Sequence, residues 1–163
     1  MEKKEIILSS EEVARILSKE WFVKDVLVHT AFMLNHGEAY LSVNRLAIES
    51  FESDVKDFVC VHEQYSFDGC CRLARLNVGS VRAIEVKVGD TEMKIDVEVE
   101  PRSIHTKSHA GIFTRFQNQN IKRGQMLKFG PVSEEVSADT ILLEVRSQLL
   151  ALSKVESHRL LPI

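Results

Sequence analysis

The sequence predicts an α+β fold in which a largely antiparallel sheet packs against helices on one face, with a long C-terminal helix. Three observations lead to this prediction. Residues 84–88 and 95–99 alternate apolar with charged side chains, as half-buried strands do, and the glycine–aspartate pair at 89–90 marks a hairpin turn. Residues 137–157 instead carry leucine and valine at helical spacing. No linker rich in proline or glycine divides the 163 residues, so we expect a single domain.

The N-terminal part of the chain predicts a short strand, a helix and a second strand. The apolar residues at 5–8 favour the first strand, and the β-branched stretch at 26–30 favours the second. Between them, Ser9 stands three residues before Glu12, which is the spacing of a capping box. Apolar side chains follow at helical spacing, so we expect a helix over residues 10–21.

The centre of the chain predicts three more strands and one helix. Along residues 40–45, tyrosine, serine and asparagine alternate with leucine, valine and arginine, which predicts a strand with two different faces. Residues 70–79 form a second strand-like run, which ends at a glycine. Residues 110–116 could add a further strand. After Ser50 the apolar side chains fall on one helical face, which predicts a helix to about Val61.

The C-terminal helix carries an apolar stripe that could serve two purposes. Its residues are Leu142, Val145, Leu149 and Leu152, and Ser137 is the candidate N-cap. The stripe could pack on a face of the sheet, or it could pair with a second copy of itself in a homodimer. It is too short for a sustained coiled coil, and both alternatives stay open.

The composition favours a cytoplasmic protein without a membrane partner. No apolar run approaches the ~20 residues of a membrane helix, and the N-terminal apolar stretch is shorter than the ~7 residues of a secretory signal core. The three cysteines, Cys60, Cys70 and Cys71, form no CxxC pair, so we expect neither a disulfide framework nor a zinc site. We expect these thiols to be reduced and mostly buried.

The strongest unusual feature is a tract without acidic residues. Residues 101–130 contain no aspartate or glutamate, although the formal net charge of the chain is −3. The amide run at 117–120 and three phenylalanines interleave with the basic residues, a combination that suits contact with phosphates and stacking on bases. The alternative is a basic surface loop that balances neighbouring acidic strands. The predicted residues for binding an anion or nucleic acid are Arg102, Lys107, Arg115, Lys122, Arg123 and Lys128.

Two histidines four residues apart, His105 and His109, stand in this tract. On a helix they would share one face, but a proline precedes them and no acidic ligand is near, so we expect no metal and no cofactor. The pair could instead supply a base and an acid for chemistry on a phosphodiester or nucleotide, with Arg45 or Lys107 holding the charge. The predicted catalytic residues are His109, His105 and Arg45.

A second polar group is expected where the strand over residues 40–45 ends. Ser42, Asn44 and Arg45 would gather with His29 if the strands that carry them are neighbours. The alternative is that Ser42 and Asn44 form the solvent face of a half-exposed strand. No Walker loop, dinucleotide fingerprint, nucleophile elbow or zinc-peptidase helix is present, so the common enzyme classes are less favoured.

Four short motifs, "TAF", "GEAYLSVNRL", "LNVGSVRAI" and "SHAGI", occur in this order along the chain. Together they resemble elements of a group of small uncharacterised bacterial proteins. The resemblance implies a bacterial or phage-related cytosolic protein, implies no activity, and favours His109 over His105 as the residue with a role. The matching positions are Ala31, Phe32, Leu41, Ser42, Val43, Gly79, Arg82, His109, Ala110 and Ile112.

Three classes of function follow from these observations. The first is a non-enzymatic accessory module that binds an anion, RNA or DNA through the basic tract. The second is a small histidine-dependent enzyme that acts on a phosphate- or nucleotide-bearing substrate. The third is a structural or interaction protein that dimerises through its C-terminal helix.

Overall fold

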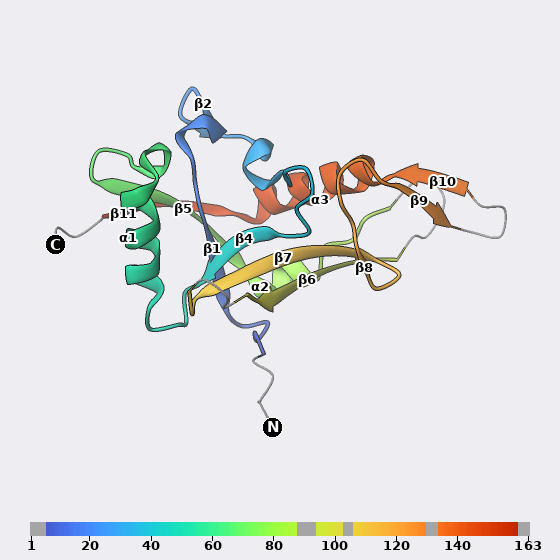
Figure 1. Ribbon diagram of the computed structural model, residues 1–163, viewed down its shortest axis with the longest axis horizontal. Helices are drawn as coiled ribbons and strands as arrows, with labels where there is room; N and C mark the ends of the chain where they lie inside the picture. Colours follow the sequence, from blue (N-terminus) through green and yellow to red (C-terminus); the bar gives the residue numbers. More distant parts are fainter. Residues whose placement is uncertain (1–5, 88–93, 103–105, 130–133, 160–163) are drawn as a thin grey trace.

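The computed structural model describes residues 6–87, 94–102, 106–129 and 134–159. Within these residues, one antiparallel sheet contains β1 (Glu12–Ile16), β4 (Leu41–Arg45), β5 (Cys70–Asn77), β6 (Ile95–Pro101), β7 (His109–Phe116), β8 (Gln119–Asn120) and β11 (Lys154–Arg159). The order across the sheet is β11-β5-β1-β4-β7-β6, and β8 pairs with β7 (Figure 1). The predicted α+β fold with a largely antiparallel sheet and a C-terminal helix is confirmed.

Helices and two small ladders complete the described chain. The ladder of β9 (Met126–Phe129) and β10 (Glu134–Ser137) lies beside the start of the C-terminal helix (Figure 1). The α-helices are α1 (Phe51–Val61), α2 (Val78–Arg82) and α3 (Ala138–Leu152). Single turns of 3-10 helix are η1 (Lys19–Trp21), η2 (His29–Phe32) and η3 (Glu63–Tyr65). The short strands are β2 (Phe22–Val23), β3 (Val26–Leu27), β9 (Met126–Phe129) and β10 (Glu134–Ser137).

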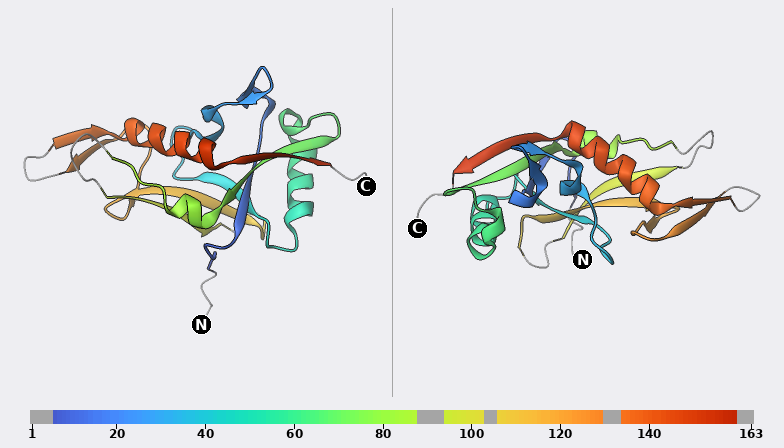
Figure 2. Two further views of the ribbon diagram at one scale, coloured as in Figure 1. Left: turned by 180° about the vertical axis from the view of Figure 1, so that it is seen from behind. Right: turned by 90° about the horizontal axis from the view of Figure 1, so that it is seen from above.

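The sheet is covered on both faces, by α3 on one side and by α1 on the other (Figure 2). Neighbouring residues of a strand project to opposite faces. Val13 of β1 therefore belongs to the main core, which includes α3, whereas Ala14 packs with Val55 and Val59 of α1. The prediction placed helices against one face of the sheet only, whereas the structure has α1 on the second face as well.

The apolar stripe of α3 packs within the chain. Val145 and Leu149 are buried in the main core, and Leu142 packs against it while partly exposed. Leu152 is 38% exposed at the end of the helix. The stripe therefore packs against the sheet, which is the first of the two alternatives. A homodimer through this helix stays a prediction.

The predicted helix over residues 10–21 is wrong, because that segment forms the central strand β1 followed by η1. β1 lies between β4 and β5, and Val13 and Ala14 are both fully buried. A strand covered on both faces shows no clean alternation of side chains, so its apolar residues imitate helical spacing. Strand pairing, a long-range interaction, outweighs the local capping signal.

Other predicted elements differ at their edges. Residues 6–8 are not a strand, and the strand expected at 26–30 is limited to β3, since η2 begins at His29. The C-terminal helix ends at Leu152 rather than continuing to 157, and the chain turns into the edge strand β11. The sequence analysis missed both β11 and the short helix α2, which Asn77 caps by accepting from Ser80 N at 2.9 Å.

The predicted hairpin between residues 84–88 and 95–99 is also wrong. Ile84 and Val86 are buried but belong to no strand, and β6 pairs with β7 instead. The expected turn at 89–90 lies outside the described residues. Alternation of side chains marks a half-buried segment, but it does not identify the partner strand.

Among the described residues, the helices are too short or too polar to cross a bilayer. Cys71 is buried and Cys70 is half-buried, as expected, whereas Cys60 is exposed on α1.

A close contact locks the pairing of β4 with β7. A Cβ atom at Gly111 would lie 2.6 Å from Cδ2 of Tyr40, so Tyr40 rests directly on the glycine backbone. The tyrosine ring also packs on Phe113 with 5.1 Å between ring centroids. Any larger residue at position 111 would displace this ring.

We therefore expect Gly111→Ala to destabilise the protein by about 1–3 kcal/mol through overpacking. At this chain length, each kcal/mol lowers Tm by roughly 2–4 °C. Calorimetry of Gly111→Ala, Tyr40→Ala and the double variant tests the contact, with Ser42→Ala as a neighbouring control. The cost of Gly111→Ala should shrink in the Tyr40→Ala background, and an equal cost in both backgrounds would contradict the proposed clash.

Candidate functional site

The register between β4 and β7 gathers polar side chains on one face of the sheet. Asn44 pairs with His109 and Ser42 pairs with Gly111, so Ser42, Asn44 and His109 project to the same side. Arg45, the next residue along β4, projects to the opposite side. The polar group expected around Ser42 and Asn44 therefore forms with His109 and without Arg45.

These side chains line a cleft of about 400 Å³ between the sheet, α1 and the 3-10 turns. One wall is polar and one is aromatic. The residues that line the cleft are Arg15, Ile16, Trp21, Asn35, Glu38, Ser42, Asn44, Asp54, Phe58, Tyr65, Thr106 and His109. We refer to this set as the cleft.

Arg15 lies where β1 and β4 part. The two strands pair only at Val13–Arg45 and Ala14–Asn44, and beyond this point the Arg15 side chain bridges the gap. Its Nε donates to the Ala31 carbonyl at 2.5 Å and its Nη1 donates to the Ser42 carbonyl at 2.8 Å. The guanidinium therefore takes the place of the missing ladder contacts.

The charge of Arg15 is poorly compensated. Within the described residues, no carboxylate lies within ion-pair distance of its guanidinium, which instead stacks 4.8 Å from the ring centroid of Trp21. Burial lowers the pKa of Arg15 from its ordinary value to about 10, and the more distant Tyr65 and Glu38 oppose this only in part. Arg15 is still charged at neutral pH, so the cleft contains a half-buried cation.

Three aromatic rings form the wall opposite the sheet. Trp21 and Tyr65 meet edge to face with centroids 6.0 Å apart, and Phe58 lies 4.9 Å from Tyr65. Because they come from η1, η3 and α1, segments distant in sequence combine to build one apolar surface. Such rings contact planar ligands well.

Asp54 ties α1 to the start of β7. Its Oδ2 accepts from Ser50 Oγ at 2.9 Å, from Ser108 Oγ at 2.6 Å and from Ser108 N at 3.2 Å. Asn44 Nδ2 in turn donates to Ser108 Oγ at 2.9 Å. Burial alone would raise the pKa of Asp54, but these hydrogen bonds outweigh it and hold the pKa below its ordinary value.

His109 is held in one tautomer. Its Nδ1 lies 2.8 Å from the carbonyl oxygen of Arg102, which can only accept, so Nδ1 carries the proton. In the neutral ring the lone pair is then on Nε2. His109 lines the cleft, His105 lies outside the described residues, and Arg45 donates to the carboxylate of Glu11 at 3.1–3.2 Å.

The residues predicted to bind an anion or nucleic acid do not form one patch. Arg102 is next to His109 at one end of β7, whereas Arg115 is near the other end, about 20 Å away at ~3.4 Å per residue. Lys122 and Arg123 lie beyond β8, and Lys128 is on β9.

Several of these cations already have partners. Arg115 forms an ion pair with Glu100 and donates to Asn120, and Lys128 lies 4.0 Å from Glu135. Arg102 stacks over the ring of Tyr40 at 5.0 Å. Lys107 and Lys122 are exposed.

Arg15 and the aromatic wall of the cleft were not predicted from the sequence. Arg15 and Trp21 stood in the segment wrongly predicted as a helix, and Phe58 and Tyr65 carried no motif. The signal that was available is the single tryptophan of the chain, which stands between Lys19 and Lys24. Within the described ranges, no three side chains of metal-binding type come together.

In comparisons with protein-family models, with curated proteins and with solved structures, no match to this chain was found. The resemblance carried by the four motifs therefore stays a prediction. Of its positions, Gly79 contacts Ser9, while Arg82 forms an ion pair with Glu98 and donates to Ser9 at 3.0 Å. These contacts join α2 to the sheet and do not reach the cleft.

Because the pKa of Asp54 is lowered in the folded protein, we expect this residue to make stability depend on pH. A carboxylate with a lowered folded-state pKa stabilises the fold above its ordinary pKa of 3.8, and this contribution is lost as the pH falls through the folded-state pKa. We expect Asp54→Asn to cost about 1–3 kcal/mol at pH 7, because Ser50 and Ser108 lose a charged acceptor. Below pH 3.8 the difference from the native protein should narrow.

Urea denaturation at pH 7 and at pH 3 measures this difference. Asp57→Asn is the matched control, since Asp57 is on the exposed side of the same helix. A destabilisation that is independent of pH, or one that Asp57→Asn reproduces, would refute the role assigned to Asp54.

Proposed function

We propose that this protein binds a small ligand that carries an oxyanion and an aromatic or heteroaromatic ring, with the cleft as the binding site. The single observation that carries the proposal is the half-buried Arg15 guanidinium, which forms no ion pair among the described residues. The two carboxylates that line the cleft already accept hydrogen bonds within the chain, Glu38 from Asn35 N and Asp54 from Ser50 and Ser108. The cleft volume of about 400 Å³ is in the usual range for small-molecule sites, ~300–1,000 Å³.

Arg15 has N–H donors left for a ligand. A guanidinium has five N–H donors, and Nε and Nη1 each use one on a backbone carbonyl. The remaining donors suit a carboxylate or phosphoryl group, whose charge would offset the burial that lowers the pKa of Arg15. A hydrogen bond to a charged group contributes roughly 1.5–3 kcal/mol.

The aromatic wall supports a ring as the second part of the ligand. Trp21, Phe58 and Tyr65 offer ring faces and edges, and stacking of a planar ring on aromatic side chains contributes about 1–3 kcal/mol. Asn35, Asn44 and His109 supply donors and acceptors for polar edges of the ring. A nucleotide or an aromatic acid has this combination of groups.

The proposal keeps the anion-binding expectation and moves it from the basic tract to the cleft. Binding along a nucleic acid needs cations that follow the phosphate path. Arg102, Arg115 and Lys128 are dispersed, and Arg115 and Lys128 have carboxylate partners. This arrangement does not support binding of a nucleic acid along the basic tract.

A small enzyme acting on the same class of ligand is the second candidate. The observation that favours it is the fixed tautomer of His109, whose Nε2 can accept a proton from a water molecule that attacks phosphorus, while the phosphorus–oxygen bond to the phenolate leaving group breaks and the phenolate takes a proton from solvent. Arg15 would hold the phosphoryl charge in place of Arg45. Phosphorus NMR of phenyl phosphate with the native protein and with His109→Ala tests this, and absence of turnover in the native protein counts against it.

Trp21 provides the readout for the binding proposal, because it is the single tryptophan of the chain and lines the cleft. We expect phenyl phosphate to change its fluorescence saturably and to bind more tightly than phenol or inorganic phosphate. Arg15→Gln should weaken the binding of phenyl phosphate by roughly tenfold or more, which corresponds to ~1.4 kcal/mol. The binding of phenol should change little.

The control variant is Arg72→Gln. Arg72 also stacks on aromatic rings, those of Phe22 and Phe67, but it pairs with Asp25 and does not line the cleft. Equal affinity in Arg15→Gln and the native protein, or an equal loss in both arginine variants, would reject the cleft as the oxyanion site. Calorimetry confirms beforehand that both variants fold.

A further inference from the structure

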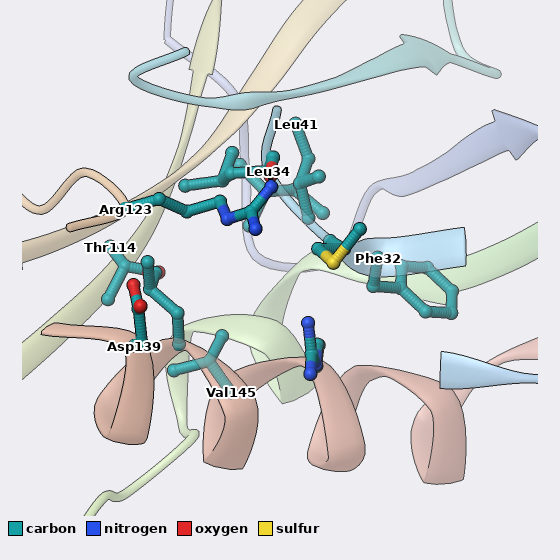
Figure 3. A pocket seen from close by; sticks show the side chains of 11 residues that line it. Phe32, Leu34, Leu41, Thr114, Arg123, Asp139 and Val145 are labelled. Atoms are coloured by element: carbon teal, nitrogen blue, oxygen red, sulfur yellow. Dashed lines mark hydrogen bonds between the residues drawn. The ribbon is translucent and has the colours of Figure 1, made fainter. Parts of the chain in front are cut away.

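A second enclosed space lies on the other side of β4, between the sheet and α3. It has a volume of about 160 Å³. Most of the residues that line it, which Figure 3 shows, are apolar, and we call it the cavity. The residues that line it are Phe32, Met33, Leu34, Leu41, Ile112, Thr114, Arg123, Asp139, Leu142, Val145 and Arg146.

Two arginines reach this cavity from different segments. Arg123 extends from the loop after β8 toward Leu34, and its Nη1 donates to the Leu34 carbonyl at 3.3 Å (Figure 3). Arg146 comes from the middle of α3, and its Nε is buried without a hydrogen-bond partner among the described residues. Buried donors are nearly always paired in folded proteins, so this one indicates a partner that the described chain itself does not provide.

The charge balance of the cavity is positive. Asp139 is the single carboxylate among its lining residues, and one oxygen of this carboxylate already accepts from Gly124 N at 3.0 Å. No carboxylate of the described chain forms an ion pair with Arg123 or Arg146. Two guanidiniums against one carboxylate favour an anionic occupant over a cationic one.

Size and lining narrow the kind of occupant. A bridging water needs only ~15 Å³, far less than the cavity offers, so a polyatomic group fits. Phe32, Leu41 and Val145 give the cavity apolar walls next to its two cations. An oxyanion attached to a short apolar body matches both properties.

We infer that the cavity is a second ligand site, in which Arg123 and Arg146 bind the oxyanion of a small ligand while its apolar part contacts Phe32, Leu41 and Val145. This site is independent of the proposed function. Leu41 lines the cavity and Ser42 lines the cleft, so alternation along β4 places the two sites on opposite faces of the strand.

Titration of the full chain with benzoate, acetate and inorganic phosphate at constant ionic strength tests the inference. We expect benzoate to bind saturably in calorimetry and to raise Tm, with acetate weaker because it lacks the apolar body. Phosphate as the tightest of the three would identify a phosphoryl group rather than a carboxylate as the preferred oxyanion. Either ranking supports the site, provided that Arg146→Gln weakens binding at least tenfold.

Two control variants distinguish binding in the cavity from binding in the cleft or at the surface. Lys122→Gln removes an exposed cation next to Arg123, and Arg15→Gln removes the cation of the cleft. Both variants should keep the binding event that Arg146→Gln removes, whereas Arg15→Gln should remove only the separate binding of benzoate in the cleft. Loss of binding in Arg15→Gln instead of Arg146→Gln would assign the anion to the cleft and overturn the inference, whereas failure of the cleft proposal leaves the cavity result unchanged.

A direct readout in the native protein does not depend on the folding of any variant. In the nitrogen NMR spectrum of the native protein, the Nε–H signal of Arg146 should shift saturably with benzoate or phosphate. Arg123→Gln is a second test variant, and we expect it to weaken binding of the anion by the same factor of at least ten. Absence of saturable binding by all three anions, or an Arg146 signal that does not move, means that the cavity holds water only and rejects the site.

Discussion

β4 and β7 pair in a register that places Asn44 opposite His109 and Leu41 opposite Ile112, and both candidate sites depend on it. A slip by one residue would exchange the faces of every side chain on β4. Two features hold the register: the burial of Leu41, Val43 and Ile112 under α3, and the close contact of Tyr40 with the backbone of Gly111. The hydrophobic requirement of one face thereby fixes where the polar side chains of the other face lie.

The same register decides which arginine can serve the cleft. The sequence favoured Arg45, because its planar guanidinium suits an anion, yet alternation turns it away from His109 and toward Glu11. Arg15 reaches the cleft because β1 and β4 pair at only two positions before they part, which leaves the Ser42 carbonyl for its guanidinium. The site is thus made by a break in the ladder and not by a local motif.

The sequence was sufficient for elements whose side-chain pattern is set locally and insufficient for those set by distant partners. The strands at 41–45 and 109–116 and the helices α1 and α3 follow their apolar periodicity, and Ser137 caps α3 as expected by accepting from Asp139 N. The prediction for β1 failed because burial on both faces removes alternation, so Val13 and Ile16 imitate a helical pair. The prediction for residues 84–88 failed because β7, far along the chain, is the partner that β6 takes.

Counting charges along the chain does not show where positive charge is available in space. Glu135 of β10 lies opposite Lys128 of β9, and Glu100 of β6 forms an ion pair with Arg115 of the neighbouring strand β7, so two cations of a tract without acids in sequence have acidic partners in space. Arg15 and Arg146 form no ion pair among the described residues and lie outside residues 101–130, whereas Arg102 and Arg123, which also form none, lie within them. Carboxylates also line both places, Glu38 and Asp54 in the cleft and Asp139 in the cavity, but none of them forms an ion pair with Arg15 or Arg146. The pairing of side chains in space, rather than the local composition of the sequence, therefore determines which cations of this fold are left for an anionic ligand.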